Sequence, residues 1–262
     1  MSSQVLRFAD WTSPVPPVRR EVLSAHPEAT EDNPPVLFVP GLGHGAWAFA
    51  EHWLAHTAAR GFAAHTVSPR AEGSLRAYVH DVIQVAAGLP RQAVLVGHGA
   101  GALVVAHALA RYPARAAVLA APVPEGWSAL GAALRANPLG TLPAIFGAAP
   151  RLSRKQLFSA DLPADAAEAY HARLSRTPAR IYRQVLFATP PAAPVGDPPA
   201  LVVGSPDDRV VPRAALDRTA ARFGGAPLLF PGMAHDLMLD TNWQEPIDAI
   251  IDWLTKELAP GP

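Results

Sequence analysis

The chain alternates between short apolar runs and longer segments in which apolar residues recur every three or four positions. The apolar runs lie at residues 36–39, 63–67, 93–96, 116–120, 200–203 and 227–230. The segments of helical period lie at residues 47–60, 75–89, 102–112, 213–223 and 243–258. A short, continuous apolar run is typical of a strand that is buried on both faces. Strands that alternate with helices in this order predict a mostly parallel sheet covered by helices on both faces.

One long segment, residues 122–199, interrupts the alternation and contains no strand-like run. Its three pieces of helical period, separated by proline and glycine, lie at residues 128–137, 164–174 and 179–187. The segment follows the carboxyl end of a strand, where open α/β sheets bind ligands, so we predict a helical lid. The alternative is a packed helical excursion with no gating role. The predicted organisation is a core of residues 1–121 and 200–262 and a lid of residues 122–199.

Composition and charge exclude several classes of protein. Of the 262 residues, 50% are hydrophobic and 17% are charged, which excludes a disordered chain. The 22 Lys and Arg residues balance the 22 Asp and Glu residues without any block of like charge, so we expect no nucleic-acid partner. Cysteine is absent, which excludes thiolate catalysis and metal sites that use cysteine.

The N-terminal residues and the apolar stretches also bear on location. Residues 1–10 lack the basic region and the long apolar run of a secretory signal. No stretch reaches the roughly 18 apolar residues that a membrane span needs. We therefore expect a cytoplasmic protein that does not insert into membranes and whose partner is a small-molecule substrate.

The turn after the run at 93–96 reads GHGAG over residues 97–101 and leads into a segment of helical period. A strand followed by G-x-S-x-G and a helix is typical of the turn that carries the nucleophile of α/β-hydrolases. Here Gly99 stands at the serine position. Because glycine has no hydroxyl, covalent serine catalysis through this turn is excluded.

With this turn, the chain resembles the α/β-hydrolase superfamily, and more closely its small esterase-like or lysophospholipase-like members, from about residue 34 to residue 258. Three further segments carry the resemblance. The segment PGLGHGAW at 40–47 matches the loop after the family's third strand. The segment LVVGSPDDRVVP at 201–212 matches the acid-bearing segment, and PGMAHDLMLD at 231–240 matches the histidine-bearing segment. Their order along the chain is that of the family. The resemblance implies an α/β-hydrolase fold, with a mostly parallel twisted sheet flanked by helices and a helical lid inserted after the sixth strand.

The resemblance also implies a catalytic base and its acid. His235 matches the base of the family, and Asp207 and Asp208 both lie where the acid is expected. Asp207 lies three residues after Gly204, whereas Asp208 lies four residues before Pro212. Alignment from both ends of the segment selects Asp208, which leaves Asp207 as a turn residue that caps backbone amides.

The remaining site residues are also assigned by resemblance. The backbone amides of Leu42 and Ala100 are expected to form the oxyanion hole. The residues expected at the substrate pocket, with His98 chiefly in a supporting role, are His44, Trp47, His98, Met233 and Trp127. His52 and His56 have the spacing of a zinc site but lack a nearby third ligand. We therefore expect neither a metal nor a cofactor.

A base and an acid that persist without the nucleophile suit proton transfer. The favoured hypothesis is an enzyme in which His235 and Asp208 act as a general base on a small or medium apolar carbonyl or ester compound, without a cofactor. The reaction would then be a non-covalent elimination, isomerisation or cyclisation. The alternatives are hydrolysis by a water that His235 activates, an ordinary serine esterase in which Gly99 is an engineered change, and a small-ligand binding protein without catalysis.

Overall fold

The computed structural model describes residues 13–29, 32–123, 131, 138 and 152–259. The strands of these residues form one sheet and are β1 (Val22–Ala25), β2 (Val36–Val39), β3 (Ala64–Val67), β4 (Val94–His98), β5 (Ala116–Ala120), β6 (Ala200–Gly204) and β7 (Leu228–Leu229). Their order in the sheet is β1, β3, β2, β4, β5, β6, β7. Only β1 is antiparallel to its neighbour, and the other pairs are parallel. This sheet confirms the predicted α/β-hydrolase architecture.

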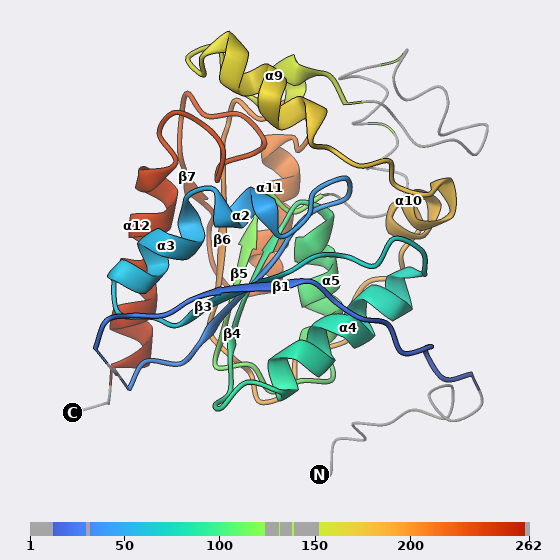
Figure 1. The fold of residues 1–262 in the computed structure, drawn as a ribbon, viewed down its shortest axis with the longest axis vertical. Coiled ribbons are helices and arrows are strands. Elements are labelled where there is room, and N and C mark those ends of the chain that lie inside the picture. The colour runs from blue at the N-terminus through green and yellow to red at the C-terminus, as the bar shows by residue number, and fades with distance from the viewer. Residues whose placement is uncertain (1–12, 30–31, 124–130, 132–137, 139–151, 260–262) are drawn as a thin grey trace.

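Helices cover both faces of the sheet. The helices of the core are α2 (Trp47–Ala50), α3 (Trp53–Ala59), α4 (Leu75–Ala87), α5 (Ala100–Leu109), α11 (Arg213–Arg222) and α12 (Gln244–Leu258). Figure 1 shows α3 and α12 on one side of the sheet and α4 and α5 on the other. In β2, Val36 and Phe38 belong to one buried cluster, and Leu37 and Val39 belong to the other. The continuous apolar runs of the sequence therefore arise because these strands are buried on both faces.

The structure differs from the predicted elements in two places within the core. The segment 47–60, predicted as one helix, forms α2 and α3, which are separate helices. Strand β1 was not expected, because it is short, lies at the sheet edge and alternates between exposed and half-buried residues. One described strand thus precedes β2, where the resemblance places two. The inserted segment accordingly follows the fifth strand of the described chain rather than the sixth.

The inserted segment contributes α8 (Arg154–Leu157), α9 (Ala164–Ala172) and α10 (Ala179–Leu186) to the described structure. Helices α9 and α10 correspond to two predicted pieces, α8 was not predicted, and the piece at 128–137 lies outside the described residues. Leu157 of α8 and Ile181 of α10 are fully buried against the core. Figure 1 shows α9 beyond the strand ends that lead into α2 and α5. The described helices are packed on the core, and a gating role stays a prediction.

None of the helices in the described residues is both long enough and apolar enough to cross a bilayer.

Candidate active site

Gly99 lies at the tip of the turn between β4 and α5. Its backbone angles, φ 56° and ψ −120°, fall in a region that glycine adopts at little cost. The flanking glycines, Gly97 and Gly101, instead allow neighbouring backbone segments to approach closely. A Cβ atom on Gly101 would collide with the carbonyl of Val39, and one on Gly97 would collide with the backbone of Gly101 and Ala102. The glycine spacing therefore permits a sharp turn that presses the start of α5 against β2.

Asp208 fixes the orientation of His235. Its Oδ2 atom accepts a hydrogen bond from His235 Nδ1 at 2.8 Å. Its Oδ1 atom accepts the backbone amides of Val210 and Val211 at 2.6 and 2.9 Å. The carboxylate is fully buried. Because Nδ1 carries the proton of this hydrogen bond, the Nε2 atom of His235 presents its lone pair.

The free nitrogen of His235 faces Gly99. A Cβ atom built on Gly99 would lie 3.2 Å from His235 Nε2, closer than an ordinary van der Waals contact. Burial lowers the pKa of His235, but the charge and hydrogen bond of Asp208, with a further contribution from the charge of Asp236, raise it above its ordinary value. The arrangement is that of an imidazole base aimed at the position that carries serine in related turns.

The predicted oxyanion amides lie on two neighbouring segments. Ala100 is the first residue of α5, so its amide has no acceptor within the helix. A Cβ atom on Gly41 would lie 3.7 Å from this amide nitrogen, which places the loop after β2 beside it. Within the described part of the chain, neither Leu42 nor Ala100 donates to a backbone carbonyl. Their assignment to the oxyanion hole stays a prediction.

The site contains a second buried pair of histidine and aspartate, His44 and Asp236. His44 Nε2 lies 2.9 Å from Asp236 Oδ2, and His44 Nδ1 lies 3.3 Å from the carbonyl oxygen of Leu42. Both ring nitrogens of His44 thus face oxygen atoms that can accept hydrogen bonds. Burial would raise the pKa of Asp236, but His44, by charge and hydrogen bond, and more weakly the neighbouring histidines, lower it below the ordinary value. The side chains of this ion pair are 4% and 0% exposed, respectively.

His98 links the two pairs. Its Nε2 atom donates to the backbone carbonyl of His235 at 3.0 Å and lies 3.7 Å from Asp236 Oδ1. Burial, and then the neighbouring His235, lower the pKa of His98 to about 3. The ring is therefore neutral at physiological pH and serves as a hydrogen-bond donor. The supporting role expected of His98 stays a prediction.

The side chains of His44, His98 and Asp236 also form a possible metal-ligand group, because each offers one ligand atom within 4.8 Å of the others. However, His44 Nε2 and Asp236 Oδ2 are hydrogen-bonded to each other, and His98 Nε2 donates to a carbonyl. A metal would have to replace all of these hydrogen bonds, so the donor set fits a polar network better than a metal site. The expectation of no metal stays a prediction.

A cavity of about 330 Å³ is lined in part by the loop after β2, residues 40–46, which we call the oxyanion loop after its predicted role. Its lining includes Leu42, His44 and Trp47, with Ser175 and Arg176 of the inserted segment. The amide of Ser175 donates to the carbonyl of Gly43 at 2.8 Å, which fastens the inserted segment to the loop. Two of the residues expected at the substrate pocket, His44 and Trp47, are thereby placed at one cavity.

Trp47 of α2 also contacts Tyr170 of α9 and Arg173, the residue that follows α9. The guanidinium of Arg173 lies 4.2 Å from the centre of the Trp47 ring, and the Tyr170 ring stacks on it at 6.3 Å. Arg173 also pairs with Glu51 at 2.9 Å. These contacts hold the described part of the inserted segment over the carboxyl ends of the strands.

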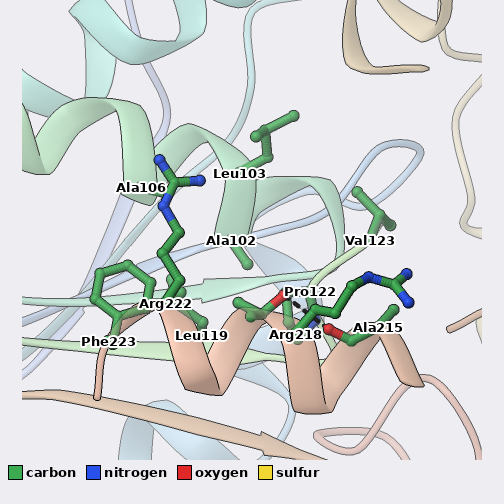
Figure 2. A pocket seen from close by; sticks show the side chains of 11 residues that line it. Ala102, Leu103, Ala106, Leu119, Pro122, Val123, Ala215, Arg218, Arg222 and Phe223 are labelled. Carbon is green, nitrogen blue, oxygen red and sulfur yellow. Dashed lines mark hydrogen bonds between the residues drawn. The ribbon is translucent and has the colours of Figure 1, made fainter. Parts of the chain in front are cut away.

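A second pocket, of about 250 Å³, lies between α5 and α11 (Figure 2). Figure 2 shows the side chains of Arg218 and Arg222, both on α11, beside an apolar lining that includes Leu103 and Phe223. The guanidinium of Arg222 donates to the carbonyl of Pro191. His235 and Gly99 do not line this pocket.

The other predicted residues take different places. Asp207 accepts the amide of Gly232 at 2.8 Å, as expected of a turn residue that caps a backbone amide. Met233 is buried in the core cluster that includes α12 residues. Trp127 lies outside the described residues. His56, one of the two histidines with zinc-like spacing, pairs with Asp248 at 2.8 Å instead.

Sequence reasoning did not single out Asp236 or Asp240. Asp240 is buried and accepts the amides of Ala234 and Thr241 at 2.9 and 2.8 Å, which closes the loop that carries His235. The available signal was the presence of two aspartates in an otherwise apolar segment after the histidine. Carboxylates are rarely buried without partners.

Comparison with known proteins agrees with this fold. The model of the alpha/beta hydrolase family matches residues 36–253. A comparison with curated proteins gives no match.

Several solved structures are similar over most of the chain. A soluble variant of monoglyceride lipase from Saccharomyces cerevisiae gives a TM-score of 0.68 at 12% identity, covering 93% of this chain and 96% of that one. The monoacylglycerol lipase of Paleococcus ferrophilus gives 0.65 at 17% identity, covering 92% and 100%. A putative non-heme bromoperoxidase from Mycobacterium tuberculosis gives 0.65 at 20% identity, covering 92% and 96%. At these identities the likeness shows a shared fold, and the family match covers most of the chain. The chain belongs to the alpha/beta hydrolase family.

Proposed function

We propose that this protein is a proton-transfer enzyme in which His235, held by Asp208, acts as a general base on a small or medium apolar carbonyl or ester compound. The reaction class is a non-covalent elimination, isomerisation or cyclisation, without a cofactor. The observation that carries the proposal is the orientation of His235. Its Nδ1 is hydrogen-bonded to a buried carboxylate, and its Nε2 faces a residue that has no side chain.

The proposed chemistry follows from that orientation. The Nε2 lone pair removes a proton from the carbon next to the substrate carbonyl, and Asp208 stabilises the imidazolium that forms. The amides of Leu42 and Ala100 would then stabilise the negative charge on the enolate oxygen. The proton returns from Nε2 to another atom of the substrate or departs with a leaving group. None of these steps requires a hydroxyl at residue 99.

The closing experiment measures proton abstraction directly. The protein is incubated in D₂O with a panel of small apolar ketones and esters, and deuterium incorporation next to the carbonyl is followed by NMR. We expect exchange that is lost in His235→Gln and retained in His56→Gln, a matched change to a histidine that pairs with an aspartate on α12. Exchange that persists in His235→Gln would refute the proposal, as would full recovery of an unchanged panel.

A second candidate is hydrolysis by a water that His235 activates. Membership of the alpha/beta hydrolase family and the absence of a side chain at Gly99, opposite His235 Nε2, favour it. The two candidates separate in H₂¹⁸O. Hydrolysis places one labelled oxygen in the acid released from an ester, whereas elimination, isomerisation and cyclisation place none there.

A further inference from the structure

The second pair, His44 and Asp236, has no role in the proton transfer proposed above. Asp236 is the residue next to His235, and its side chain is fully buried. It lies where two loops meet: the loop that carries the base, residues 231–240, and the oxyanion loop. Its Oδ2 atom binds His44 of the oxyanion loop at 2.9 Å.

The contacts of His44 explain why this pair matters for the oxyanion loop. The amide of His44 donates to the carbonyl of Gly41 at 3.2 Å, and its Nδ1 lies 3.3 Å from the carbonyl oxygen of Leu42. His44 thus folds the loop back on itself around Leu42, the residue whose amide is predicted to bind the developing oxyanion. Asp236 fixes the ring that makes these contacts.

Asp236 is fastened on its other sides as well. Its amide donates to the carbonyl of Leu157 in α8 at 2.9 Å. Its Oδ1 atom, without a hydrogen-bond partner among the described residues, lies 3.7 Å from His98 Nε2, which donates to the His235 carbonyl. A buried carboxylate bound to a facing imidazole is a strong and directional contact. The pair therefore joins the two loops that must act on one substrate.

We propose that Asp236 is a positioning residue that holds the oxyanion loop, through His44, against the loop that carries His235. This inference rests on the proposed function in one respect, the assignment of His235 as the base. The contact between His44 and Asp236 holds Leu42 and His235 at fixed positions relative to each other, so that both can act on the same substrate during proton transfer.

Charge gives the proposal a second consequence. Among the described residues, the titratable groups near His235 are the carboxylate of Asp208, the charge of Asp236 and the ring of His98, with His44 beyond His98. The charge of Asp236 raises the pKa of His235, so its removal is expected to lower that pKa. A residue that only filled space would have no such effect.

The test compares Asp236→Asn with Asp240→Asn. Asp240 is a matched control, because it is equally buried in the same loop, but it binds backbone amides and Ser159 rather than a histidine. Amide hydrogen exchange at residues 41–45 is measured by NMR, and ¹⁵N-histidine spectra give the pKa of His235, with its signal assigned by His235→Gln. In Asp236→Asn we expect exchange that is faster by about tenfold or more, as expected for loss of a charge-assisted hydrogen bond, and a lower pKa of His235. In Asp240→Asn we expect neither change.

A second variant disrupts the contact between His44 and Asp236 from the other loop. His44→Gln is expected to speed exchange at residues 41–45 to a similar extent, without lowering the pKa of His235, because Asp236 keeps its charge. Unchanged exchange in both variants, or an equal increase in Asp240→Asn, would overturn the proposal. These measurements need no substrate, so their failure is distinct from failure of the deuterium-exchange assay on which the proposed function depends.

Discussion

Two buried pairs of histidine and aspartate meet at this site, and they differ in what the second ring nitrogen faces. In the pair of His235 and Asp208, the carboxylate accepts a hydrogen bond from His235 Nδ1, and His235 Nε2 faces Gly99. In the pair of His44 and Asp236, the carboxylate binds Nε2, and Nδ1 faces the Leu42 carbonyl. The same chemistry therefore leaves Nε2 of His235 free for the proposed proton transfer, whereas both ring nitrogens of His44 face acceptors, as the proposed positioning role requires.

A third pair shows what burial adds to this comparison. His56 and Asp248 are 2.8 Å apart, the same distance as in the buried pairs to within 0.1 Å, but their side chains are 21% and 42% exposed. Water screens such a pair and competes for its hydrogen bond, so it contributes little to stability. The two buried pairs lack this competition. The two buried pairs therefore differ from the exposed pair in burial rather than in distance.

The largest effect is expected from Asp208→Asn. An asparagine is nearly isosteric but cannot hold the Nδ1 proton in the same way, so His235 adopts the wrong tautomer. The corresponding change in a serine protease triad lowers turnover by about 10⁴, and we expect a loss of that order in the deuterium-exchange rate.

The pH profile of the same variant supplies the control. The proposed proton transfer requires neutral His235, so in the unmodified protein the exchange rate is expected to rise with pH through a pKa that lies above the ordinary value. Without the charge of Asp208 this limb moves to lower pH. A variant with an unaltered rate and limb would show that Asp208 does not govern the base.

The second effect is on stability and is expected from His44→Ala. Removal of His44 leaves the buried carboxylate of Asp236 without its hydrogen-bond partner, which typically costs about 3–5 kcal/mol. His56→Ala, the matched change in the exposed pair, is expected to cost less than about 1 kcal/mol. Urea unfolding of the two variants measures both values. Equal losses would mean that burial does not distinguish the pairs.

The sequence predicts one of these pairs and not the other, for a physical reason. The resemblance assigns His235 and Asp208 roles, and the structure brings their side chains together at 2.8 Å. The strands that carry the site are also readable, because burial on both faces leaves runs apolar at every position. For the other pair, the aspartates in the apolar segment after His235 are a signal for Asp236, but nothing local connects it to His44, 192 positions away. Their contact depends on how two loops fold back over the sheet, and local patterning does not encode it.

Other parts of the fold escaped the sequence for related reasons. Strand β1 is short and borders solvent, so its alternation is weak. The segment 47–60 keeps its helical period across the break between α2 and α3, so periodicity alone cannot reveal two helices. The stacking of Tyr170 and Arg173 on Trp47 joins residues from the core and the inserted segment. Such contacts follow from tertiary packing rather than from local preference.

A smaller loss of stability than in His44→Ala is expected from Gly99→Ser, which tests whether His235 and Asp208 are still arranged to activate a nucleophile. The φ angle of 56° at this position strains any residue with a Cβ, and that atom would lie 3.2 Å from His235 Nε2. We expect a stability loss of about 1–2 kcal/mol.

If His235 and Asp208 retain the orientation of a catalytic base, the new hydroxyl of Gly99→Ser becomes reactive. A fluorophosphonate probe then labels the serine, and short acyl esters give a burst of one equivalent of alcohol product. Gly99→Ala is the matched control, because it carries the same strain without a hydroxyl and should show neither labelling nor burst. Labelling of Gly99→Ser no greater than that of Gly99→Ala would mean that this turn and its base are no longer arranged for attack on an acyl carbon. That outcome would argue against His235 and Asp208 as a catalytic base and its acid.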